Sequence, residues 1–188
     1  NLHHDRYISG EEIGSGANGI VYKYFDTKEN KSVAIKILTN VKDKDNFRKE
    51  YESSRNLKHP NCVEVLEYFA EEDFYHYGST PCIVMEYYPE TLQSRLEKGK
   101  LPPKEVLSIG IQLTNALLHA HKNDLVHRDV KPSNILFDHS GNLRLCDFGI
   151  AKSLKGNTYS SAAWSYPYAA PEQIDGRIDP RSDIYSTA

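Results

Sequence analysis

The sequence has few sulfur-containing residues, with three cysteines and one methionine among 188 residues. Cys62, Cys82 and Cys146 are odd in number and widely spaced, and they form no C-x-x-C pair. Disulfide frameworks and zinc sites use even numbers or close pairs of cysteines. The pattern favours buried, reduced thiols in a reducing compartment, and we therefore expect a cytoplasmic location.

An excess of one charge and long apolar runs are also lacking. The chain has 23 Lys and Arg against 26 Asp and Glu, a net charge of −3, which gives no general basic surface for nucleic acid or anionic membrane. No apolar run reaches the roughly 18 residues of a membrane span, and the first residues carry no apolar signal core. Because no initiator Met is present, we expect a piece of a longer chain. The length predicts one domain, which could have two lobes.

Glycines interrupt an extended segment near the amino terminus. We predict strands from Tyr7 to Leu38, with a glycine-rich turn between two extended runs. Glycine lets the backbone approach phosphate oxygens and point N–H groups at them. Similar spacing occurs in dinucleotide-binding proteins, where it opens a helix, but the β-rich residues 20–25 favour a hairpin here. The glycines concerned are Gly14, Gly16 and Gly19.

A single lysine, Lys36, lies in the middle of the short apolar strand 33–38. By itself this pattern fits an edge-strand lysine that reaches water. A charge-dense helix is predicted from Lys42 to Leu57, and two further strands are predicted at 63–69 and 82–87.

The chain then becomes helical. A short amphipathic helix is predicted over 91–98, with Gly99 as its cap, and a long helix is predicted to begin at Pro102. His119 and His121 lie two residues apart on different faces of that helix, which favours ordinary surface or packing histidines over metal ligands. Apolar residues recur at steps of three and four and predict a buried stripe of Val106, Ile109, Leu113, Ala116, Leu117 and Ala120.

Residues 127–136 concentrate ionisable and amide side chains and then become apolar. Pro132 fixes φ and has no N–H, so the polar half is a loop. Asp129 could accept a proton, Lys131 could neutralise an anion, and Asn134 could bind a metal through its amide oxygen. The alternative is a polar surface turn, which an isolated D-x-K-x-x-N would favour.

A second signal comes after this loop. Residues 135–137 and 143–145 are predicted to form a hairpin around a turn at 140–142, and the hairpin leads directly to Asp147-Phe148-Gly149. The H-R-D-x-K-x-x-N run followed by D-F-G resembles the catalytic and metal-binding loops of eukaryotic-type protein kinases. Lys131 resembles the Ser/Thr branch of that family.

The resemblance extends from about Tyr7 to the last residue, and it includes Ala170-Pro171-Glu172 and the Arg181–Ser186 segment, which resembles the start of a helix that buries an Asp beneath the catalytic loop. It implies an α+β, bilobal protein-kinase-like fold. The amino-terminal lobe and hinge (about 7–88) would hold a small antiparallel sheet with one helix. The carboxy-terminal lobe (89–188) would be mainly helical and truncated. We expect such a shortened lobe to expose apolar surface and to promote association.

The resemblance also implies ATP and Mg²⁺ as cofactors and assigns roles to residues. The catalytic residues would be Asp129, Lys131 and Asn134, and the metal ligands would be Asn134 and Asp147. Glu50 would be the ion-pair partner of Lys36, because it lies nine residues before His59-Pro60-Asn61, as in the first long helix of the family. Glu52 lies about 200° around the helix from Glu50, so both cannot face the same lysine. The nucleotide would be bound by Ile13, Gly14, Gly16, Gly19, Val21, Ala34, Lys36, Glu50, Met85, Glu86, Tyr88 and Leu136.

Regulation and substrate class are also implied by the resemblance. Ser165 occupies the position of a residue that accompanies Ser/Thr specificity, which implies a protein substrate with Ser or Thr hydroxyls. A phosphate on Thr158, Ser160 or Ser161 could pair with Arg128 and order the activation segment. For any one of the three, a flexible hydroxylated loop is an equal alternative.

One residue departs from the family pattern. Ser54 stands one turn after Glu50, where the family usually carries a bulky apolar residue. Together with the truncated lobe, it motivates a second hypothesis, a pseudokinase-like module that binds a nucleotide or partner without turnover. A small-molecule phosphotransferase of related fold is a third hypothesis, which A-P-E and Ser165 disfavour.

Overall fold

The computed structural model describes residues 2–16, 19–39, 44–72, 78–148, 152–153, 167–177 and 179–187. Two compact units account for the chain. The first unit holds residues 1–56 and 64–87, and the second holds residues 57–63 and 88–188. The segment 57–63, called the linker below, therefore belongs to the second unit although it interrupts the first in sequence.

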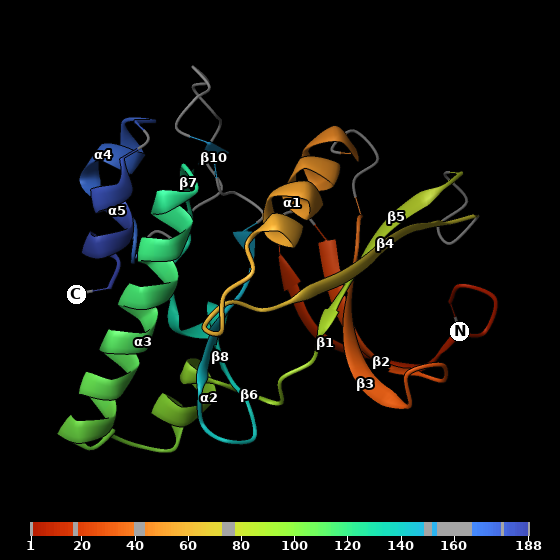
Figure 1. The fold of residues 1–188 in the computed structure, drawn as a ribbon, viewed down its shortest axis with the longest axis horizontal. Helices are drawn as coiled ribbons and strands as arrows, with labels where there is room; N and C mark the ends of the chain where they lie inside the picture. Colours follow the sequence, from red (N-terminus) through yellow and green to blue (C-terminus); the bar gives the residue numbers. More distant parts are fainter. Residues whose placement is uncertain are drawn as a thin grey trace. The chain divides into compact units, whose positions relative to one another are not determined.

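The first unit is built on an antiparallel sheet of five strands in the order β1-β2-β3-β5-β4 (Figure 1). The strands predicted between Tyr7 and Leu38 are confirmed, as are those predicted at 63–69 and 82–87, with bounds that differ by a few residues. The strands are β1 (Tyr7–Gly16), β2 (Gly19–Asp26), β3 (Lys31–Ile37), β4 (Val65–Glu71) and β5 (Thr80–Glu86).

The centre of this sheet is apolar on both faces. Val33, Ile35 and Ile37 of β3 are fully buried in one cluster. The helix α1 (Lys44–Asn56) lies within the predicted helix 42–57 and buries Phe47 in a second cluster with residues of β5 and the end of β3. A charge in a strand that is buried on both faces needs a partner. Lys36 is such a charge in β3, so we expect a partner for it.

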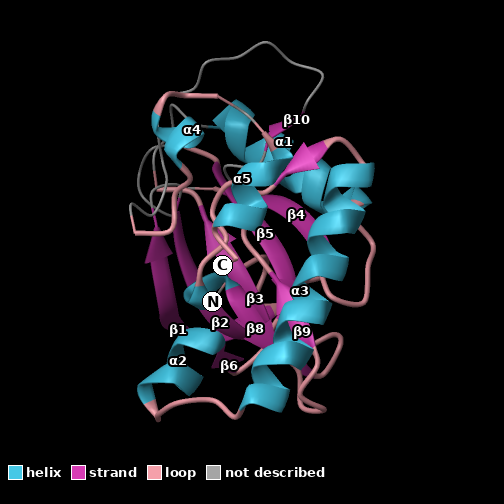
Figure 2. Ribbon diagram, turned by 90° about the vertical axis from the view of Figure 1, so that its left-hand side faces the viewer, coloured by secondary structure: helices cyan, strands magenta, loops and turns pink. Residues whose placement is uncertain are grey.

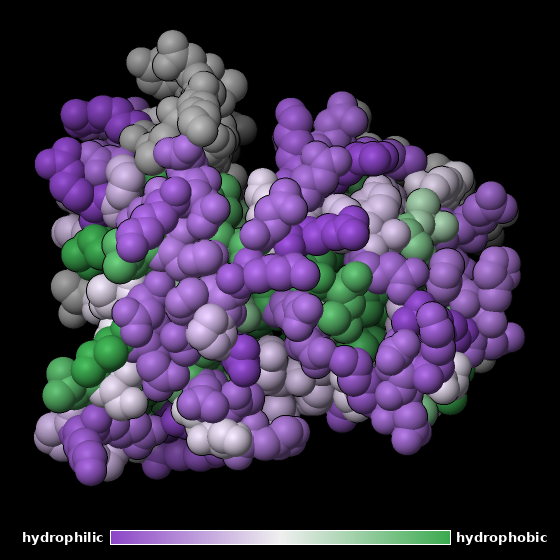
Figure 3. Space-filling model, viewed as in Figure 1, coloured by the Kyte–Doolittle hydropathy of each residue, from purple (hydrophilic) through white to green (hydrophobic). Residues whose placement is uncertain are grey.

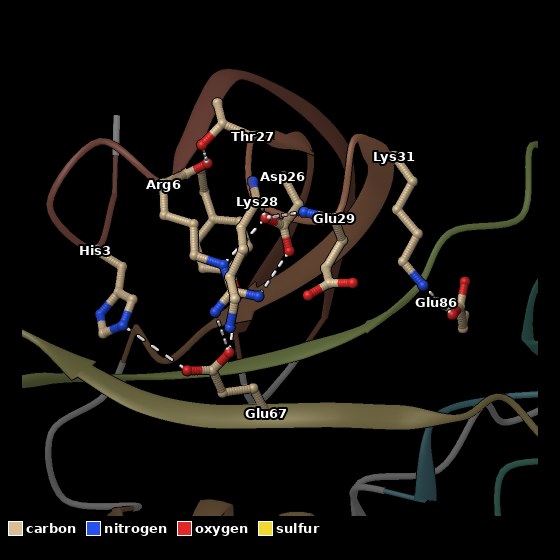
Figure 4. Close-up of polar contacts among 10 residues, drawn as sticks. His3, Arg6, Asp26, Thr27, Lys28, Glu29, Lys31, Glu67 and Glu86 are labelled. Carbon is tan, nitrogen blue, oxygen red and sulfur yellow. Dashed lines mark hydrogen bonds and ion pairs between the residues drawn. The ribbon is translucent and has the colours of Figure 1, made fainter.

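A polar cluster that the sequence patterns did not predict ties the amino-terminal segment to the sheet (Figure 4). The Arg6 guanidinium donates two hydrogen bonds to the carboxylate of Asp26, at 3.0 and 2.8 Å, and a third to Glu67 at 2.6 Å. The backbone amides of Lys28 and Glu29 also donate to Asp26, whose exposed fraction is 1%. Burial alone would raise the pKa of Asp26, but these hydrogen bonds outweigh it and hold that pKa below its usual value.

The second unit combines helices with short strands (Figure 2). Thr91 caps α2 (Leu92–Glu97), and Pro103 is the first residue of α3 (Pro103–Lys122). The predicted hairpin is confirmed as β8 (Ile135–Phe137) and β9 (Leu143–Leu145), with β6 (Glu90–Thr91) paired to β8. The remaining elements are β7 (Leu125–Val126), β10 (Lys152–Ser153), the 3-10 turn η2 (Pro132–Asn134), α4 (Pro171–Ile174) and α5 (Pro180–Tyr185).

The core of the second unit forms around α3. Five residues of the predicted stripe, from Ile109 to Ala120, are buried, but Val106 is 53% exposed and its predicted burial is wrong. Val106 lies in the first turn of the helix, before the stripe reaches the hairpin. Leu107, Ile111 and Leu118 are also exposed, and Figure 3 shows hydrophobic residues at the surface of this part of the molecule. Within the described ranges, no helix is both long and apolar enough to cross a membrane.

Candidate functional site

In the first unit, Lys36 of β3 and Glu50 of α1 form an ion pair. The distance from Lys36 Nζ to Glu50 Oε1 is 2.6 Å, and the exposed fractions are 6% and 8%. Glu52 instead pairs with Arg48 on the exposed side of α1. The predicted partnership between Lys36 and Glu50 is therefore confirmed. A buried pair with this geometry holds the lysine in one orientation.

The glycine-rich turn joins β1 to β2, and its residues 17 and 18 lie outside the described residues. Gly16 pairs with Gly19 at the end of the hairpin. A Cβ on Gly19 would meet the carbonyl oxygen of Ile37 at 2.4 Å, so the close approach of β3 requires glycine there. A Cβ on Gly14 would meet no atom within 4 Å, so packing places no such demand on Gly14.

The predicted nucleotide-binding residues of the first unit lie on β1, β2, β3 and β5. Val21 pairs with Lys36 and Ala34 pairs with Met85, so they occupy neighbouring positions on the central strands. Glu86 ends β5; Lys31 Nζ lies 2.6 Å from its Oε1, and its backbone amide donates to the carbonyl oxygen of Glu64 at 3.0 Å. Ile13 is exposed on β1.

Two further nucleotide-site candidates belong to the second unit. Tyr88 lies under the guanidinium of Arg144, at 5.6 Å from the ring centroid. Leu136 is the central residue of β8 and pairs with both Arg144 and Thr91.

The structure brings Asp129, Lys131 and Asn134 together in the loop before β8. Oδ2 of Asp129 accepts hydrogen bonds from Lys131 Nζ at 2.9 Å and from Asn134 Nδ2 at 3.1 Å. Oδ1 of Asp129 is buried and has no hydrogen-bond partner among the described residues. A buried carboxylate oxygen without a donor is costly, so this atom is a candidate acceptor for a substrate proton.

Asn134 and Asp147 offer hard oxygen ligands that suit Mg²⁺. Asn134 Nδ2 donates to the backbone oxygen of Asp129 at 2.8 Å as well as to its carboxylate, so the amide nitrogen faces two acceptors and the amide oxygen is left for a cation. The backbone amide of Cys146 donates to the carbonyl oxygen of Asn134 at 3.0 Å, which connects this loop to the residue before Asp147. Asp147 is exposed and has a φ of 63°. These residues fit the predicted metal.

His127 holds two loops together from a fully buried position. Its Nδ1 accepts from the backbone amide of Asp129 at 3.2 Å, so the proton of the neutral ring lies on Nε2, which donates to the carbonyl oxygen of Cys146 at 2.9 Å. Phe148 packs edge-on against the ring, with 4.6 Å between centroids. His127 is therefore a structural connector between the Asp129 loop and the segment at Asp147.

Asp183 of α5 is fully buried, as the resemblance implied, and it supports the loop that contains His127 and Arg128. Its Oδ1 accepts from the backbone amide of Arg128 at 2.8 Å, and its Oδ2 accepts from that of His127 at 2.9 Å. Arg128 has a φ of 71°, a left-handed conformation that these two bonds stabilise. His121 Nε2 lies 2.7 Å from Asp183 Oδ2, a partner that helical spacing alone could not have revealed.

Arg128 is also held through its backbone. Gln173 of α4 donates from Nε2 to the carbonyl oxygen of Arg128 at 2.9 Å, and its Oε1 accepts from the amide of Ala170. Burial lowers the pKa of Arg128, an effect that Asp183 partly offsets. Gly149 and the proposed regulatory residues Thr158, Ser160, Ser161 and Ser165 lie outside the described residues.

Comparison with known proteins finds similarity over nearly the whole chain. Residues 7–188 match the protein kinase domain family. The chain is 41% identical to the serine/threonine-protein kinase PrkC of Bacillus subtilis, over 96% of this chain and 29% of that protein. It is 40% identical to a probable serine/threonine-protein kinase of Clostridium perfringens, over 97% of this chain and 27% of that protein. It is 34% identical to serine/threonine-protein kinase 36 of Pongo abelii, over 97% of this chain and 14% of that protein.

The chain thus spans less than a third of the length of these relatives. The match nevertheless covers the antiparallel sheet with its buried Lys36–Glu50 pair and the loop that joins Asp129 to Asn134. The chain therefore belongs to the protein kinase domain family.

Proposed function

We propose that this domain is a Ser/Thr protein kinase that transfers the γ-phosphoryl group of ATP to Ser or Thr hydroxyls of protein substrates. The observation that carries this proposal is the Asp129 carboxylate. Its Oδ2 is fixed by Lys131 and Asn134, and its Oδ1 is buried with no hydrogen-bond partner among the described residues. A donor that reached that oxygen would not have to displace an existing hydrogen bond.

The reaction is a direct transfer. The hydroxyl oxygen of Ser or Thr forms a bond to the γ-phosphorus, the bond from that phosphorus to the bridging oxygen of ADP breaks, and the hydroxyl proton moves to Asp129. Lys131 stays beside Asp129 and offsets negative charge on the transferred group. Lys36, held by Glu50, orients the remaining phosphates.

Asn134 and Asp147 are the residues proposed to hold the metal. When bound there, Mg²⁺ would neutralise charge on the phosphate oxygens. The direction of the Asn134 amide supports this assignment, because both acceptors of its nitrogen belong to Asp129. The glycine-rich turn, Ile13, Val21, Ala34, Met85, the Glu86 and Tyr88 backbone and Leu136 are proposed to enclose the nucleotide.

Transfer of labelled phosphate from γ-labelled ATP to Ser/Thr peptides tests the proposal. The variant Asp129→Asn should lower the rate by about 10²–10⁴-fold, because it removes a proton acceptor. Asp175→Asn, which changes an exposed carboxylate of the same unit, is the matched control and should leave the rate unchanged. Equal labelling by wild type and Asp129→Asn, or no labelling by either, would refute the enzyme hypothesis.

The alternative is a module that binds nucleotide or a partner without turnover. It rests on Ser54, a partly buried hydroxyl residue on α1, one turn beyond Glu50. Nucleotide binding measured by calorimetry, combined with absent transfer, would favour this alternative. Replacing Ser54 with Leu should then raise activity if the small side chain is what weakens the site.

We also propose control by phosphorylation of Thr158, Ser160 or Ser161, with Arg128 as the cation that pairs with the phosphate. Mapping the residues modified during autophosphorylation tests this directly. If Thr158→Ala, Ser160→Ala and Ser161→Ala together leave the activity of autophosphorylated protein unchanged, the regulatory proposal is wrong.

Four further proposals concern the lobes, the location, the partners and the association of this protein. Lobes of about 7–88 and 89–188 would correspond to the amino-terminal part with hinge and the partial carboxy-terminal part. We propose a cytoplasmic location, which the free thiols of Cys62, Cys82 and Cys146 support. Protein substrates are the proposed partners, and we propose none among nucleic acids or membranes. Association through exposed apolar surface can be tested by sedimentation.

A further inference from the structure

The linker, residues 57–63, forms backbone hydrogen bonds with β9. The backbone amide of Leu145 donates to the carbonyl oxygen of Asn61 at 2.8 Å, and the amide of Val63 donates to the carbonyl oxygen of Leu145 at 2.9 Å. The other edge of β9 pairs with β8. This three-residue strand is therefore fixed along both edges.

Two side-chain amides fasten the same strand to α3. Gln112 Oε1 accepts from the backbone amide of Leu143 at 2.9 Å and from Asn61 Nδ2 at 3.1 Å. Asn61 Nδ2 also donates to the carbonyl oxygen of Leu143 at 3.1 Å. Both backbone groups of Leu143, which is fully buried, thus bond to side chains from other elements.

The position of β9 matters because the strand leads directly to a proposed metal ligand. It ends at Leu145, and Asp147 comes two residues later. Between them, Cys146 uses its amide to bond Asn134 and its carbonyl to accept from His127. A shift of β9 along its axis would therefore be transmitted to Asp147 and to the Asn134 loop together.

We propose that Gln112 and Asn61 are positioning residues that set the register of β9 and so place Asp147 for metal binding, an inference that rests on the proposed function only for the role of Asp147. The two side chains have opposite hydrogen-bonding roles. Gln112 acts on β9 and on Asn61 only as an acceptor, and its nitrogen makes a separate exposed contact with Ser108. The side-chain hydrogen bonds that Asn61 makes with the described residues are both donated from Nδ2.

Because Gln112 accepts and Asn61 donates, two near-isosteric substitutions, Gln112→Glu and Asn61→Asp, should have different effects. Gln112→Glu keeps an oxygen that can accept from both Leu143 and Asn61, so it should behave as wild type. Gln112→Leu removes that acceptor and should disturb β9. Asn61→Asp replaces a donor with an oxygen that faces two acceptor oxygens, so it should be as harmful as Gln112→Leu or more so.

The first measurement is hydrogen exchange of the Leu143 amide in the protein without nucleotide or metal. Gln112→Leu and Asn61→Asp should each increase its exchange rate by about tenfold or more, while Gln112→Glu keeps it near the wild-type rate. This readout does not depend on catalysis. If Gln112→Glu accelerates exchange as much as Gln112→Leu does, the acceptor role is wrong.

The second measurement is Mg²⁺ affinity in the presence of a non-hydrolysable ATP analogue, followed by calorimetry. Gln112→Leu should weaken Mg²⁺ binding by about tenfold, the scale of loss expected when a residue that orients a metal ligand is replaced, and Gln112→Glu should leave it unchanged. Leu117→Val, a core change on the same helix, is the control for lowered stability alone and should also leave Mg²⁺ affinity unchanged.

The outcomes separate the two proposals. Loss of Leu143 protection with unchanged Mg²⁺ affinity would overturn the positioning role and leave the network purely structural. A wild-type domain that binds no magnesium nucleotide would also overturn it. A domain that binds magnesium nucleotide as expected but transfers no phosphoryl group would refute the proposed kinase activity, and the positioning of Asp147 would stand.

Discussion

Two aspartates in different units show how the same side chain can serve stability or chemistry. Asp26 is 1% exposed, and both of its oxygens are bound by Arg6, with two backbone amides in addition. Asp129 has one oxygen held by Lys131 and Asn134, while the other has no hydrogen-bond partner among the described residues.

The two carboxylates differ in whether both of their oxygens accept hydrogen bonds. A carboxylate whose two oxygens both accept hydrogen bonds stabilises the fold and has less capacity for a further donor. A carboxylate with one oxygen left over costs stability and remains able to accept a proton. Asp183 is an intermediate case, because it is fully buried and satisfied, yet it supports the loop that carries Asp129.

The largest loss of stability is expected from Arg6→Met. The substitution leaves Asp26 buried without its cation, which costs about 3 kcal/mol of unfolding free energy. Chemical denaturation measures this value. Arg48→Met removes the exposed pair with Glu52 and should cost about 0.5 kcal/mol or less. Equal losses in the two variants would contradict the special role of Arg6.

A smaller loss of stability is expected from Asp183→Asn. An amide group can accept with only one oxygen, so its NH₂ must face an N–H donor from His127 or Arg128, at a cost of about 1–3 kcal/mol. Unfolding curves give the stability, and kinase assays on the folded variant should show a further loss because the Asp129 loop shifts. If activity falls only in proportion to the folded fraction, the supporting role of Asp183 is refuted.

Acid should weaken the Asp26 cluster in a predictable direction. The pKa of Asp26 is lowered in the folded state from an ordinary value of 3.8. Its stabilisation is therefore complete above about pH 3.8 and is lost as the pH falls through the folded-state pKa. Because burial raises the pKa of an Asp26 that lacks Arg6, the stability gap between wild type and Arg6→Met should narrow on acidification. A gap that widens below pH 5 would contradict this account.

The smallest stability effect is expected from Asp129→Asn. The amide can keep its oxygen toward Lys131 and Asn134 and place its NH₂ where Oδ1 now has no donor, so the free energy of unfolding should change by no more than about 0.5 kcal/mol. Thermal unfolding beside the phosphotransfer assay tests this. A loss of unfolding free energy as large as that of Arg6→Met would mean that Asp129 stabilises the fold as Asp26 does.

Local patterns predicted much of the fold. The hairpin at 135–145, the strands of the sheet, α1, α2 and α3 are indicated by alternation, helical periodicity and flanking glycine or proline residues. The choice of Glu50 over Glu52 came from helix geometry together with the family resemblance. These features depend on residues close together in the chain, so their signals survive in a single sequence.

The features that sequence reasoning missed depend on distant partners. Arg6 meets Asp26 and Glu67, and His121 meets Asp183, across separations that no periodicity encodes. Val106 was predicted to be buried because it continues the apolar spacing of α3, but it is 53% exposed. Burial depends on what lies opposite, and the helix alone does not specify that.

The path of the chain has a consequence for dissecting this protein. Residues 57–63 leave the first unit, supply Leu57 and Cys62 to the buried core of the second, and then return. A fragment that begins at residue 88 would therefore lack part of its own interior, whereas adding residues 57–63 as a separate peptide could restore it. Complementation between these two pieces would allow the second unit to be prepared and labelled apart from the first.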